Sequence, residues 1–257
     1  MTARVDLRLD IRGGSTVGYL TVDNRAKLNT LDRALMREFI AAIETLAPRA
    51  DLRALVLTGA GDKAFIGGAS IPEMAALDTD SARDFITLVH QTCDGLRRLP
   101  VPVIARIDGF ALGAGLEVAV SCDLRVASTR AQFGMPEVKV GIPSVVEAAL
   151  IPQLIGFGRA RELLMLGETI DAATALRWGL VERVVAPEAL DAEVEKVVAA
   201  LLAAGAQAVR RQKALMQAWE RLPADEAVAA GVDAFTRAFE SDEPQRMLSV
   251  FAKRKRD

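Results

Sequence analysis

The segment GFALGAGLEVAV, residues 109–120, carries the strongest structural signal in the chain. The segment follows an apolar stretch, residues 101–107, which predicts a buried strand. Within residues 109–120, Glu117 is the only ionisable residue. Small side chains let a ligand approach the main chain closely, and a helix that starts among them leaves free N–H groups in its first turn. The segment therefore predicts a strand, a ligand-binding turn and a helix.

The same arrangement occurs earlier in the chain. An apolar strand at residues 54–58 runs on through Gly61 to Gly67, Gly68 and Ala69. A helical pattern precedes each strand, at residues 35–46, where Asp32 is the expected N-cap, and at residues 81–99. Two β-stretches at residues 5–11 and 17–22 can pair at the start of the chain. Two consecutive βα cycles predict an α/β protein with a parallel sheet.

Composition excludes several classes of protein. The 257 residues include 32 Lys+Arg and 34 Asp+Glu, so no broad positive field is available for a nucleic-acid partner. Cys93 and Cys122, with the single histidine His90, match neither a disulfide framework nor a zinc spacing, which favours a reducing, cytoplasmic location. Apolar runs are too short for a membrane-spanning helix, so we expect no membrane partner.

Glycine and proline divide the chain into two parts. Residues 1–190 hold 17 of the 19 Gly and 8 of the 10 Pro, whereas the remaining residues follow a helical pattern. We therefore predict a core at residues 1–195 that carries the site and a helical segment at residues 196–257.

Two carboxylates stand out because apolar residues surround them. Glu117 lies within the pattern LEVAV, and Glu137 lies in an apolar turn at residues 133–138. Burial would raise the pKa of either group, which suits a general acid or base. The alternative for each is a solvated surface glutamate, and the pattern alone leaves both readings open.

Two other constellations are weaker. Residues 113–118 begin like a dinucleotide fingerprint, but Val118 replaces the third glycine. Ser70 and Ser144 could serve as nucleophiles of a serine hydrolase, with His90 as the only histidine base. However, His90 lies in an apolar helical pattern, where a packed or surface histidine is more typical.

Several motifs occur together in a specific order. They are Asn24-Arg25 with residues 27–29, the segments 63–71, 102–105 and 109–117, Cys122-Asp123, and residues 131–137. With these motifs the chain resembles the enoyl-CoA hydratase/isomerase family, also called the crotonase family, over essentially its whole length. The resemblance implies a crotonase-like spiral of ββα turns followed by a C-terminal helical segment that packs in homotrimers, commonly paired into homohexamers.

The resemblance also assigns roles to residues. The N–H groups of Ala69 and Ala114 match the family's oxyanion hole, and Glu117 and Glu137 match its two catalytic glutamates. The residues expected to bind the acyl-CoA substrate are Lys27, Leu28, Ser70, Ile71, Gly113, Pro136 and Ser144. No metal or other cofactor is expected, because coenzyme A is part of the substrate.

The expected activity is reversible hydration of a 2-enoyl-CoA to a 3-hydroxyacyl-CoA in fatty acid metabolism. Three kinds of alternative remain: isomerisation of an enoyl-CoA, decarboxylation or hydrolysis of an acyl-CoA, and acyl-CoA binding without catalysis. Three positions depart from the family pattern: Ala114 replaces a glycine, Ser70 stands where aspartate is frequent, and residues 141–147 replace a longer glycine-rich loop. Glu147 in that loop is interpreted as an ordinary glutamate in the first turn of a helix, the alternative being a third acid facing the pocket.

Overall fold

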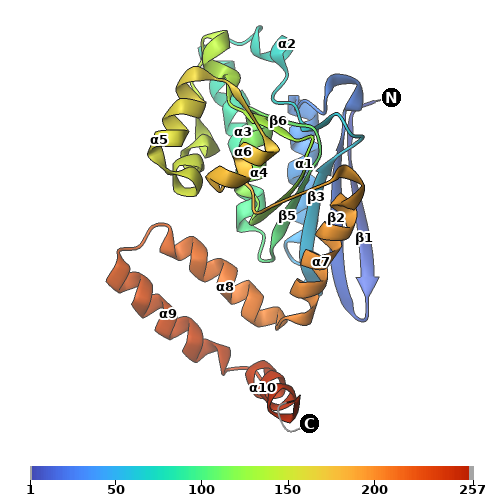
Figure 1. Cartoon of the computed structure of the whole chain (residues 1–257), viewed down its shortest axis with the longest axis vertical. Coiled ribbons are helices and arrows are strands. Elements are labelled where there is room, and N and C mark those ends of the chain that lie inside the picture. The colour runs from blue at the N-terminus through green and yellow to red at the C-terminus, as the bar shows by residue number, and fades with distance from the viewer. Residues whose placement is uncertain (1, 255–257) are drawn as a thin grey trace.

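The computed structural model describes residues 2–254 (Figure 1). The strands are β1 (Arg4–Arg12), β2 (Ser15–Asp23), β3 (Leu52–Gly59), β4 (Ala64–Ile66), β5 (Val103–Ile107), β6 (Phe110–Leu112), β7 (Leu124–Ser128), β8 (Gln132–Gly134), β9 (Thr169–Asp171) and β10 (Arg183–Val185). They form a sheet with the order β1-β2-β3-β5-β7-β10 and a second sheet with the order β4-β6-β8-β9.

The larger sheet is parallel except at its first edge. β1 and β2 form an antiparallel hairpin in which Arg4 lies opposite Asp23 and Arg12 opposite Ser15. β2, β3, β5, β7 and β10 then pair in parallel. The parallel sheet predicted from the βα cycles is confirmed.

The α-helices are α1 (Arg33–Leu46), α2 (Ile71–Met74), α3 (Thr79–Arg98), α4 (Ala114–Ser121), α5 (Ile151–Leu166), α6 (Ala172–Trp178), α7 (Leu190–Ala203), α8 (Ala206–Trp219), α9 (Ala224–Ala238) and α10 (Glu243–Arg254). Short 3-10 helices are η1 (Arg25–Lys27), η2 (Pro136–Val140), η3 (Val146–Leu150) and η4 (Pro187–Ala189). No helix within residues 2–254 is long and apolar enough to cross a membrane.

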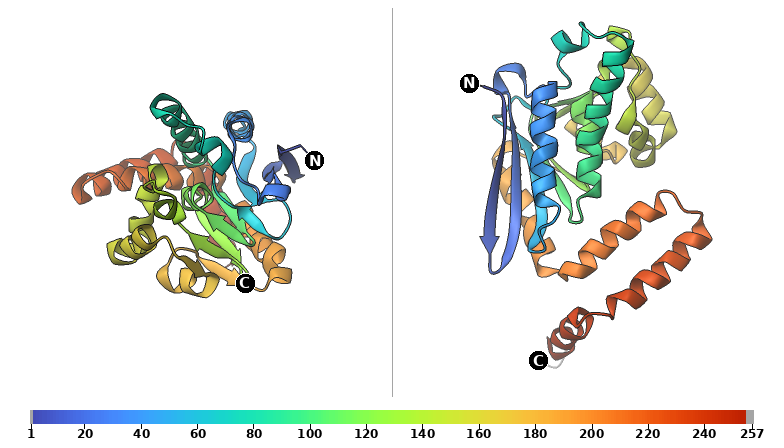
Figure 2. Two further views of the ribbon diagram at one scale, coloured as in Figure 1. Left: turned by 90° about the horizontal axis from the view of Figure 1, so that it is seen from above. Right: turned by 180° about the vertical axis from the view of Figure 1, so that it is seen from behind.

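Helices cover both faces of the larger sheet. α1 begins at the predicted cap, where the Asp32 carboxylate accepts a hydrogen bond from the Leu35 N–H at 2.8 Å, and its apolar side joins α3 in the main core (Figure 2). On the opposite face, α7 packs Val194 and Val198 against Val56 and Ile104 of the sheet. Apolar cores therefore lie on both faces of the sheet, as expected for parallel strands.

The two sheets are built by a repeated unit. In the chain, a strand of the larger sheet is followed three times by a strand of the smaller sheet, giving the pairs β3–β4, β5–β6 and β7–β8. Helix α3 follows the first pair and helix α4 follows the second. The chain thus winds as a spiral of ββα turns, and the predicted fold class is confirmed. The spiral brings the ends of β4, β6 and β8 together, where the predicted small-residue turns lie.

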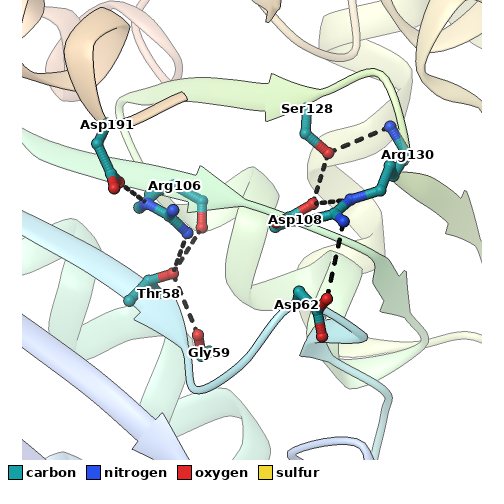
Figure 3. Close-up of polar contacts among 8 residues, drawn as sticks. All are labelled: Thr58, Gly59, Asp62, Arg106, Asp108, Ser128, Arg130 and Asp191. Carbon is teal, nitrogen blue, oxygen red and sulfur yellow. Dashed lines mark hydrogen bonds and ion pairs between the residues drawn. The ribbon is translucent and has the colours of Figure 1, made fainter. Parts of the chain in front are cut away.

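Polar contacts fix the strand ends that lead into these turns (Figure 3). Arg106 donates to Asp191 at 2.5 Å, which ties β5 to the start of α7. Asp108 is buried and accepts hydrogen bonds from Ser128 at 2.6 Å and from Arg130 at 2.5 Å. Burial opposes the charge of Asp108, but these hydrogen bonds prevail and lower its pKa. The exit of β5 toward residues 109–113 is therefore held in place.

The C-terminal helices extend away from the spiral (Figures 1 and 2). Lys213 of α8 is buried and its Nζ donates to the carbonyls of Leu96 and Val101 and, at 2.7 Å, to Asp123. The predicted helical tail is confirmed, whereas the boundary proposed after residue 195 falls inside α7, a helix that packs on the sheet. The division into two parts remains a prediction.

Candidate active site

A cavity of about 980 Å³ opens where the small-residue turns meet. It lies between the α2–α3 segment, the start of α4, and the chain from η2 to η3. Its apolar walls include Met74, Leu77, Phe85, Ile86, Val89, Leu112, Ile142 and Val145. Of the predicted site residues, the cavity brings together Ala69, Ile71, Gly113, Ala114, Glu117, Pro136 and Glu137. Glutamates on a largely apolar surface are the arrangement expected of a binding pocket that also performs chemistry.

Two backbone amides at the cavity wall are free to bind a ligand. Ala69 follows the glycine pair at the end of β4, and Ala114 is the first residue of α4, where helical N–H groups have no intrahelical partner. Within residues 2–254 neither amide donates a hydrogen bond to the protein. Both amides therefore remain available to a ligand oxygen, and the α4 dipole favours negative charge beside Ala114.

Glu137 lies against the turn that carries the Ala114 amide. It sits in the first turn of η2, and its Oε2 accepts a hydrogen bond from the Ser144 hydroxyl at 2.8 Å. A Cβ atom at position 113 would lie only 2.5 Å from Glu137 Oε1, and Gly113 has a φ of 52°. Glycine at this position therefore allows the carboxyl group to lie next to the first turn of α4.

Glu117 projects from α4 and is 4% exposed. The helix lies directly on β4, since a Cβ at Gly115 would be 1.9 Å from the Ile66 carbonyl oxygen. Burial raises the pKa of Glu117 to about 8, and the negative charges of Glu137 and Glu147 add to the rise. The N–H groups of Ala148 and Val145 act in the opposite direction. The expectation that burial raises the pKa of Glu117 is confirmed.

The remaining predicted residues lie at or beyond the rim. Lys27 is exposed in η1, and the carbonyl of exposed Leu28 accepts a hydrogen bond at 2.8 Å from the N–H of Gly67, a residue of the cavity wall. Ser70 caps α2, its Oγ accepting from the Glu73 N–H at 3.5 Å. Ser144 is not among the cavity-lining residues in the described part of the chain, but its hydroxyl is hydrogen-bonded to Glu137, which is.

The serine-hydrolase alternative lacks its base. His90 Nδ1 lies 2.7 Å from Glu147 Oε1, and within the described residues neither Ser70 nor Ser144 forms a hydrogen bond with His90. No serine–histidine pair is therefore assembled in this structure.

The interpretation of Glu147 was wrong in part. Glu147 does lie in the first turn of η3, a 3-10 helix, but its side chain is 8% exposed and contacts His90 instead of solvent. It is also absent from the cavity wall, so it is not a third acid facing the pocket. Burial raises its pKa, and the hydrogen bond to His90 opposes the rise.

Sequence reasoning missed most of the apolar wall. Phe85, Ile86 and Val89 of α3 line the cavity, as does Val145 before η3. The apolar stripe of α3 was visible in the sequence, but periodicity cannot tell a stripe that lines a cavity from one that packs entirely in the core.

The chain is similar to known proteins in sequence and in overall structure. The family model described as enoyl-CoA hydratase/isomerase matches residues 12–257. A crotonyl-CoA hydratase of Syntrophomonas wolfei is 36% identical, covering 91% of this chain and 90% of the relative. A short-chain-enoyl-CoA hydratase of Clostridium acetobutylicum is 33% identical, covering 93% of this chain and 92% of the relative. The crystal structure of an enoyl-CoA hydratase from Bacillus anthracis superposes with a TM-score of 0.91 at 29% identity, covering 96% of each chain.

Proposed function

The chain belongs to the enoyl-CoA hydratase/isomerase family, and we propose that it is an enoyl-CoA hydratase, which adds water reversibly to a 2-enoyl-CoA to give a 3-hydroxyacyl-CoA. One observation carries the proposal: two unpaired backbone N–H groups and two glutamates line the same apolar cavity. Relatives named as hydratases of crotonyl-CoA and of short-chain enoyl-CoA support it.

The amides of Ala69 and Ala114 form the oxyanion hole in this proposal. Addition of water to the β-carbon of an enoyl thioester places negative charge on the carbonyl oxygen. Two fixed N–H donors aimed at that oxygen stabilise the charge, and loss of one such donor typically costs about 3 kcal/mol of transition-state stabilisation. Because both donors belong to the main chain, the alanine at position 114 can serve where the family usually has glycine.

Glu117 and Glu137 move the protons. In hydration, ionised Glu117 takes a proton from water as the oxygen attacks the β-carbon, and protonated Glu137 gives a proton to the α-carbon. The pair therefore holds one proton before and after the reaction, and only its position changes. Two acids that could each take part favour hydration over simple double-bond isomerisation, which can proceed with one.

The raised pKa of Glu117 fits a pair that shares a single proton. With a pKa of about 8, Glu117 carries the proton near neutral pH in the free protein, which is the form needed for dehydration. The hydration form has the same total number of protons but carries the proton on Glu137. The two forms belong to one coupled titration, so the pair as a whole sets the pH range of activity.

The thioester would enter beside the rim. Leu28 is hydrogen-bonded to the cavity wall and Lys27 is exposed next to it, which supports contact between this segment and the coenzyme A moiety. Ile71 and Pro136 line the cavity and would contact the thioester end of the substrate. Water addition leaves the oxidation state of the substrate unchanged overall, so the proposed reaction requires no redox cofactor.

We also propose assembly into homotrimers or homohexamers and a cytoplasmic location. Val228, Val232 and Phe235 recur on one side of α9 and are each more than 60% exposed, which supports a covered surface in an assembly. Two buried free cysteines are compatible with a reducing compartment. Sedimentation of the purified protein tests the assembly, and a single monomeric species at micromolar concentration would contradict it.

The hydratase activity is tested by following the absorbance of the conjugated double bond of crotonyl-CoA. We expect turnover by the wild-type protein and a loss of about 10³-fold or more in Glu117→Gln, since the neutral amide keeps the shape but cannot accept the proton. Glu162→Gln, the same change on an exposed glutamate of α5, serves as the control. Near-normal turnover by Glu117→Gln would contradict the assigned role.

A further inference from the structure

Glu147 is a buried acid that the mechanism above does not use directly. Its Oε1 lies 2.7 Å from His90 Nδ1, and its Oε2 is buried without a hydrogen-bond partner in the described part of the chain. A buried carboxylate with one unsatisfied oxygen is costly for stability, so a contact that compensates it is significant. That contact joins η3 to α3 across 57 positions of the chain.

The residue before Glu147 has a strained backbone. Val146 has a φ of 40°, and a positive φ is a genuine outlier for a β-branched side chain. Such a conformation persists only where the surrounding structure holds the chain on both sides. Here Val145 lines the cavity on one side, and Glu147 is tied to His90 on the other. The Ala148 N–H closes the turn by donating to the Val145 carbonyl at 2.9 Å.

This strained turn faces the catalytic acid. Val145, on one side of the strained residue, lines the same cavity as Glu117, and the N–H groups of Val145 and Ala148 act to lower the Glu117 pKa against the effect of burial. Ala148 is buried in the main core, where η3 packs on both α3 and α4. A shift of η3 away from α3 would therefore displace the cavity wall at Val145 relative to Glu117.

Charged groups around the contact come from two helices. His90, Asp94 and Arg97 of α3 all act on Glu147, and Glu117 of α4 feels the Glu147 charge through space. The Cys93 thiol also lies near both glutamates and stays neutral, because burial and the two carboxylates raise its pKa well above its usual range. The charge of Glu147 is thus a direct electrostatic influence on Glu117.

We propose that His90 and Glu147 are positioning residues of the hydration reaction, whose contact clamps the turn at residues 145–148 to α3 and so keeps the cavity wall in place beside Glu117. Neither residue touches the substrate in this inference. It rests on the proposed hydratase function, since it explains how one of the two acids of that reaction is held. A clamp of this kind also accounts for the strained φ of Val146.

The test uses the full-length protein and five variants. Glu147→Gln removes the charge but keeps an oxygen that can accept from His90, whereas Glu162→Gln is the same change on the exposed surface of α5. His90→Leu removes the clamp, and His90→Asn restores a side-chain N–H donor near the Nδ1 position. Infrared difference spectroscopy follows protonation of the Glu117 carboxyl, assigned by its absence in Glu117→Gln. Steady-state kinetics with crotonyl-CoA give kcat and KM, and thermal unfolding reports stability separately.

The titration midpoint of Glu117 and the kcat of the variants distinguish the proposed clamp from a contact that only stabilises the fold. We expect Glu147→Gln to lower the titration midpoint of Glu117 by about half a pH unit or more, because a neighbouring like charge is removed, and Glu162→Gln to leave it unchanged. We expect His90→Leu to lower kcat about tenfold with little change in KM, and His90→Asn to recover most of the loss.

If the wild type is active, any one of three results would overturn this inference and leave the proposed function standing. They are an unshifted Glu117 titration midpoint in Glu147→Gln, an unchanged kcat in His90→Leu, and no recovery of kcat in His90→Asn. A wild type that hydrates no enoyl-CoA would overturn the proposed function and the inference with it.

Discussion

Substitution of Gly113 by alanine tests the geometry of the site with a single methyl group. The new Cβ would lie 2.5 Å from Glu137 Oε1, whereas carbon and oxygen atoms pack without strain at about 3.5 Å. Glu137 must therefore withdraw by about 1 Å. A displacement of that size in a catalytic group costs about 100-fold in rate, equivalent to about 2.7 kcal/mol of activation free energy.

A backbone control separates this clash from strain. Gly113 has a φ of 52° and a ψ of −123°, a sparsely populated conformation, so alanine also strains the main chain by about 1–3 kcal/mol. Gly14, in the turn between β1 and β2, has a φ of 83° and no atom within 4 Å of an added Cβ. Gly14→Ala therefore reproduces a strained backbone without a clash at the site.

The assay measures kcat for hydration of crotonyl-CoA together with urea unfolding of both variants. We expect both to lose stability but only Gly113→Ala to lose kcat, by about 100-fold. If the kcat of Gly113→Ala stayed within about twofold of Gly14→Ala, the carboxyl group of Glu137 would not need to lie where this structure places it, and the reasoning would fail.

Three further predictions concern protonation, orientation and stability. Hydration requires one proton on the glutamate pair, and Glu117 loses its proton as the pH rises through about 8. We therefore expect kcat/KM for hydration to fall over that range, and a kcat/KM profile that is flat from pH 7 to 10 would refute this. Ser144→Ala removes the 2.8 Å hydrogen bond to Glu137 and should lower kcat about three- to tenfold, a loss of about 1 kcal/mol, without changing unfolding in urea; an unchanged kcat would show that Ser144 does not orient the acid. Lys213→Met leaves two buried carbonyls without a donor and removes the cation beside Asp123, which keeps only its hydrogen bond from the Val103 N–H. It should cost about 2–3 kcal/mol in urea unfolding, against no measurable loss for exposed Lys196→Met; equal stability of the two variants would count against the anchor of α8.

Local patterns in the sequence were sufficient for most of the fold. The helix over residues 35–46, with its cap at Asp32, and the strands at residues 54–58 and 101–107 depend on periodicity and nearby residues, and they occur within a few positions of the prediction. The apolar neighbours of Glu117 in the chain favoured its burial for the same reason, but only the structure decided between a buried and a solvated glutamate.

Contacts between distant segments were beyond such patterns. The partner of Glu147 is 57 positions away, and Lys213 reaches carbonyls more than 100 positions earlier in the chain. The positive φ of Val146 contradicts the local preference of a β-branched residue and arises from tertiary packing. These features depend on how the spiral closes, which no single segment specifies.

A crystal structure with a bound acyl-CoA is the most direct test of the central claim. We expect the thioester oxygen within about 2.7–3.1 Å of the backbone nitrogens of both Ala69 and Ala114, with Glu117 and Glu137 facing the two carbons next to the carbonyl. A thioester that binds elsewhere, or an oxygen that reaches neither amide, would contradict the account.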